Sequence, residues 1–398
     1  MHTSRRLAAL GSGVFARNDA RKQVYRDHAQ HAGASGLIDL SLGSSDLRPP
    51  SPVMRAMSEA IPAASSSAYC LNAATAPFRE AVADWCFRRF GVTVDPDDEV
   101  QLLVGSQEGT AHLPLAVLNP GDSALVLDPC YPSHRGGLLL ADADVISMRL
   151  RASHGWRPPL HELAASVWDR LKLFVFGYPH NPTARVGDQE LLNQVMHLGG
   201  RHQVVIAHDN PYVDLALEGQ APSLLLSPGW RDWGIEFFSL SKGWCLGGFR
   251  LAFAVGAAPL IAALRQVKAI VDFNQSLALQ QAAIKALRDH ADWPATICNT
   301  YRQRRDAVRL GLADRGWSVP KPNMALYLWL PCPEVAVKQG WGDERCAAEL
   351  LQRSGVALTP GSGFGQGGAG WLRMALVQPL PELERAVSRL ADAVDALG

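Results

Sequence analysis

Seven short apolar runs, separated by stretches of helical pattern, limit the folds that this chain can adopt. They lie at residues 100–105, 124–129, 144–150, 171–177, 203–208, 235–241 and 250–256. Runs without a clean period of two are typical of strands buried on both faces, as in a largely parallel sheet covered by helices. The connection over residues 242–249 is too short for a parallel crossover, so we expect an antiparallel or displaced final strand. The sequence therefore predicts an α/β fold with a mostly parallel, seven-stranded mixed sheet.

The segments on both sides of this block predict a second, smaller unit. Upstream, the pattern indicates helices over 14–31, 52–61 and 76–90 and a short strand over 37–43. Downstream, it indicates a helical stretch at 257–290, which is long enough to bridge two domains. The elements expected after it are helices over 295–315, 343–354 and 380–397, strands over 325–330 and 371–377, and a glycine-rich loop at 360–368. We expect an N-terminal arm and part of a small domain over 1–45, a large three-layer domain over 46–285, and a smaller α+β domain over 286–398.

Composition excludes several classes of function. Among the 398 residues, 47% are hydrophobic, which is enough for a large core, and Lys+Arg and Asp+Glu balance at 38 each. The balanced charge gives no field that favours nucleic acid or an anionic membrane, and no apolar stretch reaches the length of a membrane span. Seven cysteines form no CxxC pair and no metal-like spacing with histidines. We therefore expect a cytoplasmic protein with reduced thiols, no metal site, no nucleic-acid partner and no membrane partner.

Lys242 lies in a short polar and glycine-rich break between the last two predicted strands. Desolvation there favours the neutral amine, which is the form that attacks a carbonyl carbon, so this lysine is a candidate for Schiff-base chemistry. A surface lysine in a turn is the alternative that the residue alone leaves open.

Polar residues follow the carboxyl ends of the other strands, where open α/β sheets bind ligands. Ser106 and Gln107 start a helix whose backbone N–H groups suit an anion, although such a turn is often simple geometry. Tyr131 either packs in its loop or covers a flat ring. Asn181 precedes a proline and fits a turn equally well, and Asp209 fits a helix cap.

Four further residues complete the set: Tyr212, Ser239, Arg250 and Arg373. Arg250 begins the returning strand and suits a phosphate in forked geometry, or a salt bridge between domains. Arg373 begins a late strand and suits a carboxylate, whether of a ligand or of a surface residue. Pyridoxal phosphate requires a lysine, an aspartate for its ring nitrogen, an Asn/Tyr pair for its phenolic oxygen, a stacking aromatic, and donors for its phosphate. The combined residues predict this cofactor.

In this order the motifs resemble those of the class I and II aminotransferases of pyridoxal-phosphate fold type I, from about residue 37 to residue 395. The matching pieces are Leu40–Gly43, Tyr69, Phe78–Glu80, Gly105–Glu108, Asn119–Asp122, Asp128–Pro132, Asn181–Thr183, Asp209–Tyr212, Ser239–Lys242, Gly248–Arg250 and Arg373. The stretch from Gly105 to Asp122 is most similar to the branch of LL-diaminopimelate and related aminotransferases. The resemblance implies amino transfer between an α-amino acid and a 2-oxo acid by a ping-pong mechanism.

The resemblance also implies a role for each matching residue. Lys242 would hold the cofactor as an internal aldimine and then move a proton, and Asp209 would keep the ring nitrogen protonated. The other cofactor contacts would be Asn181 and Tyr212 at the phenolic oxygen, Tyr131 against the ring, and Ser106, Gln107, Ser239 and Arg250 at the phosphate. Tyr69 would reach the phosphate of a neighbouring subunit, so a homodimer with shared active sites is expected. The substrate α-carboxylate would be bound by Arg373, Asn181 and the backbone of Gly43.

Other functions share these residues or this fold. A β-lyase, decarboxylase, racemase or cyclase would use the same cofactor site. A non-catalytic pyridoxal-phosphate regulator would carry a basic DNA-binding segment, but only about 35 residues precede the matching region. A nicotinamide enzyme would need a GxGxxG turn after the first strand, which this chain lacks. The chain departs from the family at Ala74, usually glycine, and at Ser45, usually proline, which puts the substrate side-chain pocket and the partner-facing loop in doubt.

Overall fold

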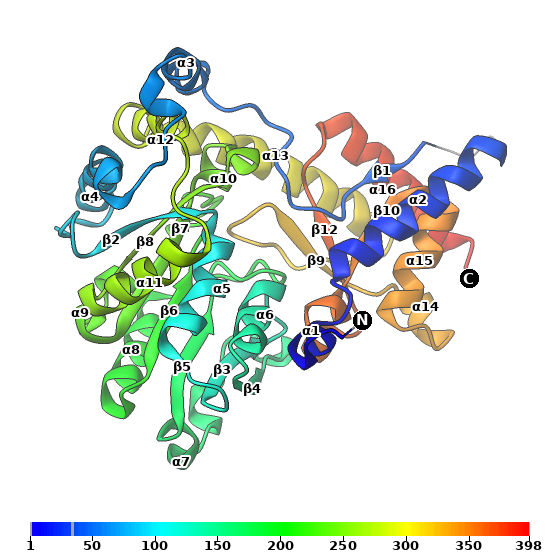
Figure 1. Cartoon of the computed structure of the whole chain (residues 1–398). Helices are drawn as coiled ribbons and strands as arrows, with labels where there is room; N and C mark the ends of the chain where they lie inside the picture. The colour runs from blue at the N-terminus through cyan, green and yellow to red at the C-terminus, as the bar shows by residue number, and fades with distance from the viewer. Residues whose placement is uncertain (1, 33–35, 398) are drawn as a thin grey trace.

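A seven-stranded sheet forms the centre of the larger part of the molecule (Figure 1). The computed structural model describes residues 2–32 and 36–397. The strands of the sheet, in spatial order, are β2 Val100–Val104, β8 Leu251–Gly256, β7 Gly234–Ser239, β6 Val205–Asp209, β5 Leu171–Phe176, β3 Ser123–Asp128 and β4 Asp144–Arg149. Strand β8 is antiparallel to both β2 and β7, whereas the other neighbouring strands are parallel. The predicted α/β class and the mixed sheet with an antiparallel final strand are confirmed.

Helices cover both faces of this sheet and make three layers. One face carries α5 Ser106–Val117, α6 Pro132–Leu140 and α11 Ala258–Val271, and the other carries α4 Ala76–Phe90, α8 Gln189–His202 and α12 Leu277–Asp289. Adjacent residues of β7 show the two faces, because Phe237 lies against Gly109 of α5 while Phe238 packs on Trp85 of α4 with ring centroids 5.2 Å apart. Near the edges of these layers lie α3 Ser51–Ala60, α7 Ala165–Trp168 and α9 Trp230–Trp233.

The helical stretch expected at 257–290 differs in the structure, which has two helices with a break over residues 272–276. Phe273 has φ 63°, which no helical residue adopts, and Ser276 caps α12 by accepting a hydrogen bond from the N–H of Ala278 at 3.3 Å. The element that starts between the two hydrophobic cores is instead α13 Trp293–Ala313, whose Trp293 packs against both cores. A helical period alone could not show this break, because both helices keep their apolar faces inward.

A second hydrophobic core forms around the remaining elements, on the right in Figure 1. Strands β11 Thr359–Pro360, β12 Trp371–Ala375 and β9 Tyr327–Pro331 make an antiparallel sheet, and β1 Ile38–Asp39 pairs in parallel with β10 Val356–Ala357. The helices of this part are α13, α14 Glu334–Lys338, α15 Asp343–Ser354 and α16 Leu380–Asp395, with α2 Val14–Ala32 beside α15. The domain boundaries near residues 45 and 285 stay a prediction.

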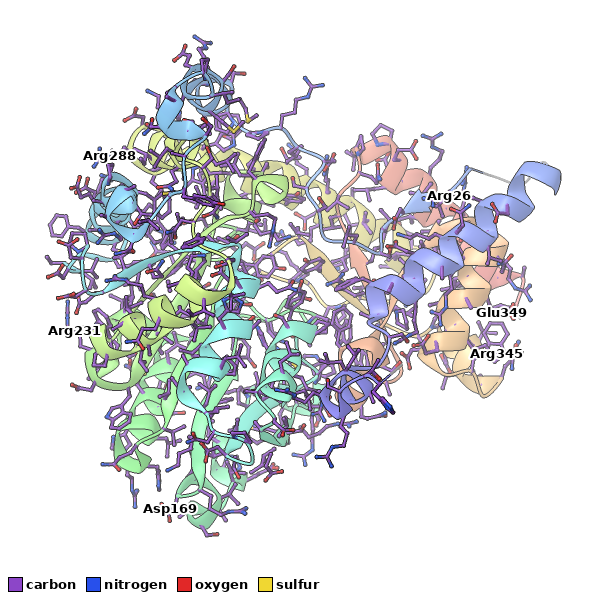
Figure 2. The ribbon with its side chains drawn as sticks, in the orientation of Figure 1. Arg26, Asp169, Arg231, Arg288, Arg345 and Glu349 are labelled. Atoms are coloured by element: carbon purple, nitrogen blue, oxygen red, sulfur yellow. The ribbon has the colours of Figure 1, made fainter. Side chains whose placement is uncertain are left out.

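Charged side chains lie mainly on the outside of the molecule, as Figure 2 shows for Arg231, Arg288 and Glu349. Many are used in surface ion pairs, such as that of Arg231 with Glu99 at 2.9 Å. The short helix α1 Arg5–Leu10 lies against α6. All seven cysteines are free thiols, and six of them are buried. Within residues 2–32 and 36–397, no helix is both long enough and apolar enough to cross a bilayer.

Candidate active site

A cavity of about 290 Å³ opens at the carboxyl ends of the parallel strands, where the two cores meet. Every residue that the sequence singled out for cofactor, substrate or catalysis lines it, except Tyr69: Gly43, Ser106, Gln107, Tyr131, Asn181, Asp209, Tyr212, Ser239, Lys242, Arg250 and Arg373. Successive parallel strands end at the same edge of a sheet, which brings residues that are far apart in the sequence to one place.

Lys242 lies in a short helix, α10 Leu240–Gly243, directly after strand β7. Ser239 caps this helix, and its Oγ accepts a hydrogen bond from the N–H of Ser241 at 3.2 Å. The lysine side chain is half-buried, and its Nζ donates a hydrogen bond to the carbonyl oxygen of Gly43. This contact joins the end of the large sheet to the segment that follows β1. The amine is therefore held inside the cavity without a carboxylate partner among the described residues.

Asp209 ends strand β6 and is buried. Its Oδ2 lies 3.0 Å from Nε2 of His134, whereas its Oδ1 has no hydrogen-bond partner within the described part of the chain. His134 belongs to α6 and also lines the cavity, a position that the sequence did not indicate as functional. The only signal for it is its place three residues after Tyr131, within the first turn of a helix that Pro132 starts. One carboxylate oxygen thus remains available to a donor in the cavity.

A second group of residues lies together at the start of α5, and we call it the phosphate cradle after the ligand that the sequence predicts there: Gly105, Ser106, Gln107, Ser239 and Arg250. Gly105 has φ 79°, and a β-carbon there would lie 2.0 Å from Nη2 of Arg250, so only glycine fits against this guanidinium. Arg250 itself has φ 56° and donates from Nη1 to the carbonyl oxygen of Gly247 at 3.0 Å. The positive end of a helix and an arginine therefore face the same part of the cavity.

Arg373 lies on the opposite wall and is 1% exposed. Its Nη1 donates to Oδ1 of Asn181 at 2.9 Å and its Nη2 to the carbonyl oxygen of Ser41 at 2.9 Å, but its Nε has no partner among residues 2–32 and 36–397. No carboxylate in that described part forms an ion pair with it. A buried guanidinium without a counter-ion is costly, which suits a ligand carboxylate.

Two tyrosines connect this wall to the lysine. The hydroxyl groups of Tyr212 and Tyr327 lie 2.7 Å apart, and Nδ2 of Asn181 donates to the Tyr212 hydroxyl at 3.3 Å. Burial, with the neighbouring Tyr327, raises the pKa of Tyr212 well above its usual value. Burial acts in the same direction on Tyr327, but the charges of Lys242 and Arg373 outweigh it and lower the pKa of Tyr327. Nothing in the local pattern singles out Tyr327, because an aromatic residue in a strand normally packs in the core.

The N-terminal arm contributes Phe15, which lines the cavity from α2. Its ring lies 5.5 Å from the central carbon of the Arg373 guanidinium and 6.3 Å from the ring of Tyr131. The Tyr131 hydroxyl donates to Oε1 of Gln107 at 3.2 Å, and burial raises its pKa to about 12. The sequence predicted a helix over 14–31 in an N-terminal arm, but it did not indicate Phe15 as a residue of the site. The sparse apolar positions of that helix did not indicate which of them would be buried.

Tyr69 lies outside the cavity and is 88% exposed. Its ring packs against that of Phe273 with centroids 5.8 Å apart. The structure therefore does not bring Tyr69 together with the other candidate residues of its own chain.

The two departures from the family pattern have local explanations. Ser45 Oγ lies 2.8 Å from the Tyr301 hydroxyl and accepts a hydrogen bond from the N–H of Leu47, so hydrogen bonds of the serine side chain hold this loop. Ala74 lies in a short 3₁₀ turn, Asn72–Thr75, and is not among the described residues with positive φ. Neither position requires the residue type that the family usually has there.

Comparison with known proteins identifies the family. The family described as aminotransferase class I and II matches residues 35–390. An LL-diaminopimelate aminotransferase from Desulforudis audaxviator is 36% identical over 388 residues, which cover 97% of this chain and 96% of that protein. Among solved structures, a probable N-succinyldiaminopimelate aminotransferase from Thermus thermophilus is 39% identical with a TM-score of 0.88, covering 96% of this chain and 100% of that one. Apo-BacF from Bacillus subtilis is 27% identical with a TM-score of 0.93, covering 100% of both chains. The chain therefore belongs to the class I and II aminotransferases and is a transaminase.

Proposed function

We propose that this transaminase holds pyridoxal phosphate in the cavity and uses Lys242 to transfer an amino group between an α-amino acid and a 2-oxo acid. One observation carries the proposal: an amine, a carboxylate, an anion cradle and a buried guanidinium, on Lys242, Asp209, the phosphate cradle and Arg373, all open onto one cavity of about 290 Å³. These are the groups that the cofactor and an amino-acid substrate require together.

The protein's own atoms fit this cofactor. The free Oδ1 of Asp209 suits a protonated ring nitrogen, because a buried carboxylate oxygen without a donor is unfavourable. The first N–H groups of α5 have no partner within the helix and suit a phosphate, and Gly105 lets the Arg250 guanidinium approach the same place. When bound, pyridoxal phosphate supplies an aldehyde carbon for the amino group and a ring that accepts electrons from the substrate α-carbon.

Lys242 is positioned to act as the base. In its neutral form the amine removes the proton from the substrate α-carbon, a contribution of about 10²–10⁴-fold in rate. The carbonyl oxygen of Gly43 holds Nζ in the cavity when it is not otherwise engaged. His134 contacts Oδ2 of Asp209 and thereby orients the other oxygen toward the cavity. On the facing wall, Arg373 and Asn181 would hold the α-carboxylate, which fixes the α-carbon relative to the lysine.

The amino donor is a proposal that rests on the relatives. Those named above are an LL-diaminopimelate aminotransferase and a probable N-succinyldiaminopimelate aminotransferase. We propose that the donor of this chain belongs to the same chemical class, a long amino acid with a polar distal end. Ser45, where the family usually has a proline, lines the cavity and is a position at which this chain's side-chain pocket differs from the family pattern.

We also propose a homodimer in which Tyr69 enters the neighbouring subunit's active site. Exposed apolar residues lie close to Tyr69 or to its contact Phe273 in the sequence: Leu71 at 59% exposure just after Tyr69, and Ile270 at 89% and Val271 at 55% just before Phe273, itself at 41%. Apolar side chains gathered around one exposed aromatic residue are typical of an interface between proteins.

The cofactor assignment is tested by Lys242→Ala. The purified variant should lose the visible absorption band of bound pyridoxal phosphate and should not convert an amino donor to its oxo acid, whereas Lys285→Ala, at an exposed surface pair with Asp289, should keep both. An unchanged spectrum in Lys242→Ala would refute the assignment. Product analysis with diaminopimelate-type, acidic and aromatic donors then separates amino transfer, which yields an oxo acid and a new amino acid, from lyase or decarboxylase chemistry.

A further inference from the structure

The break between α11 and α12, residues 272–276, contacts two regions that the proposed function assigns to different active sites. We call it the linker loop. One region is the phosphate cradle of the same subunit. The other is segment 66–70, which carries the exposed Tyr69. The side chains of the loop divide between these two regions.

Gln275 connects the linker loop to the cradle. Its side chain is 9% exposed, and Nε2 donates both to the carbonyl oxygen of Leu103, at 2.8 Å, and to that of Arg250. Leu103 lies two residues before Gly105, and Arg250 precedes strand β8. One amide group therefore fixes the distance between the two strand ends that form the cradle. Arg250, in its left-handed conformation, depends on such support because few non-glycine residues adopt it unaided.

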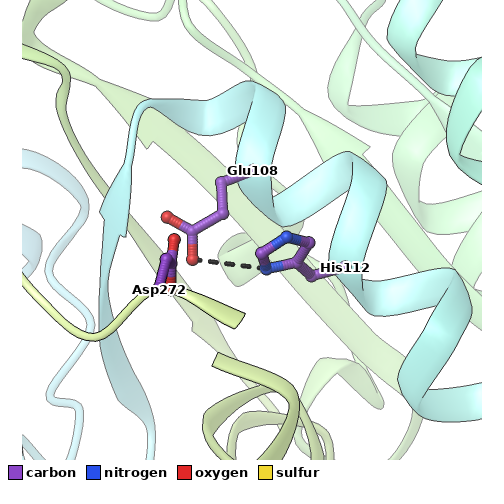
Figure 3. Close-up of side chains that lie close together, drawn as sticks. All are labelled: Glu108, His112 and Asp272. Atoms are coloured by element: carbon purple, nitrogen blue, oxygen red, sulfur yellow. Dashed lines mark ion pairs between the residues drawn. The ribbon is translucent and has the colours of Figure 1, made fainter. Parts of the chain in front are cut away.

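An ion-pair cluster connects the start of the linker loop to the same region. Figure 3 shows Glu108, His112 and Asp272 close together. The buried ammonium of Lys268 lies 2.8 Å from Oε1 of Glu108 and 3.1 Å from Oδ1 of Asp272, so the lysine supplies the cation that these carboxylates need. Glu108 also accepts a hydrogen bond from the N–H of Val104, just before the cradle. Asp272 is thus tied to the start of α5 through Lys268 and Glu108.

The other three residues of the linker loop hold segment 66–70. Phe273 packs on the ring of Tyr69, and Nδ2 of Asn274 donates to the carbonyl oxygen of Cys70 at 3.0 Å. Ser276 Oγ donates to the carbonyl oxygen of Ser66. The backbone on both sides of Tyr69 is therefore held by the same short loop whose Gln275 holds Arg250.

We propose that the linker loop positions phosphate-binding residues of two active sites at once, Arg250 in its own subunit and Tyr69 in the neighbouring one. The proposal rests on the proposed function, in which Tyr69 crosses to the other subunit. In this arrangement Gln275 is a positioning residue for its own site, and Asn274 is a positioning residue for the other site. The two neighbouring residues should therefore act on different sites of the same dimer.

Dimers made of two different subunits, of which only one can give the cofactor absorption band, test whether Gln275 and Asn274 act on different active sites. One subunit carries Lys242→Ala, so that only the Lys242 of the other, reporting subunit gives the absorption band when pyridoxal phosphate is titrated into the apoenzyme. Asn274→Ala should weaken binding about fivefold when it is placed in the Lys242→Ala subunit, and should have no effect in the reporting subunit. Gln275→Met removes two hydrogen bonds and should weaken binding about tenfold or more, but only in the reporting subunit.

Controls separate this proposal from a general loss of structure. Asn299→Ala and Gln194→Met, at exposed side chains of α13 and α8, should leave binding unchanged in either subunit. If Asn274→Ala prevents mixed dimers from assembling, Phe273→Leu removes the ring contact with Tyr69 instead and should act in the same crossed pattern. Equal effects from both subunits, or none, would overturn the proposal. Absence of a band in the wild-type protein, or a monomer that binds fully, would instead overturn the proposed function.

Discussion

Arg373→Met is the substitution whose effect the structure defines most narrowly. The guanidinium is buried, donates to Asn181 and to the backbone of Ser41, and has no carboxylate partner within the described residues. The rings of Tyr327 and Phe364 lie 4.4 Å and 4.7 Å from its central carbon, so a methionine chain would keep contact with the same rings. The change therefore removes the charge and the forked donors with little loss of packing.

The expected loss follows from the donors that remain free. The Nε and the second N–H groups of Nη1 and Nη2 can bind a substrate carboxylate in forked geometry. Removal of one partner of a buried charge pair costs about 2–5 kcal/mol, which corresponds to a decrease of about 30- to 5,000-fold in kcat/KM. Stability should not decrease in parallel, because the wild-type charge is buried without a counter-ion and an apolar replacement is often neutral or stabilising.

The assay compares an amino acid with the amine that lacks its carboxylate, each in a single-turnover amino-transfer reaction. Wild type should react much faster with the amino acid than with the amine, and Arg373→Met should lose most of that difference while its slow reaction with the amine changes little. Arg373→Lys keeps the positive charge but loses the two parallel donors of the guanidinium. Its preference for the amino acid over the amine should therefore lie between those of wild type and Arg373→Met. A decrease by the same factor for both substrates, or a large decrease in the unfolding temperature, would refute the role given to this arginine.

Three further predictions concern other parts of the structure. Gly105→Ala should weaken pyridoxal phosphate binding about 5- to 30-fold, on the order of 1–2 kcal/mol, because φ is 79° and a β-carbon would lie 2.0 Å from Nη2 of Arg250; titration of the apoenzyme measures this. Tyr327→Phe removes one partner of a 2.7 Å hydroxyl pair beside the cofactor site and should lower kcat/KM about fivefold in steady-state kinetics. Burial alone would raise the pKa of Asp39, but hydrogen bonds from Lys22 and Ser41 lower it, so the stability that this carboxylate contributes should be present above about pH 4 and lost as pH falls below that. In acid unfolding, Lys22→Met should reduce this loss, and the part due to Ser41 should remain.

Two of these substitutions have a matched comparison. Gly342→Ala changes a glycine with open space around its α-carbon and without a positive φ, and should leave cofactor binding as it is. Lys338→Met breaks an exposed pair with Glu334 and should leave the acid unfolding curve unchanged. A Gly105→Ala protein with normal affinity would contradict the close packing of the cradle. An unaltered acid transition in Lys22→Met would contradict the role of the Asp39 pair.

The strands of the large sheet could be predicted because the sequence pattern that marks them is local. A buried parallel strand needs an apolar run of about five residues, and a short connection between antiparallel strands is visible as such. The break at residues 272–276 was not predictable in this way, because Phe273 carries no signal for a positive φ. Only the contacts of the loop with distant residues stabilise that conformation.

The residues of the candidate site also fall into two groups, those that a local sequence signal reveals and those that only tertiary packing reveals. Lys242, Asp209 and Asn181 follow strands, and their chemistry is unusual enough at those positions to be recognised. His134, Tyr327 and Phe15 enter the cavity through packing between elements far apart in the chain. A histidine in a helix, a tyrosine in a strand and a phenylalanine in an N-terminal helix each have an ordinary structural role, so only the three-dimensional arrangement shows their contribution.

The pairing of β2 with β8 also has a consequence for the order in which this protein is completed on the ribosome. Strand β2 lies at one edge of the sheet and is held there by β8, whose residues 251–256 are made long after residues 100–104. Until then, the apolar β2 has no neighbour in this sheet, and Gly105 has no Arg250 beside it. The phosphate cradle cannot exist in the nascent chain before β8 emerges, so cofactor cannot guide the early steps of folding and is expected to stabilise only the late, nearly complete chain.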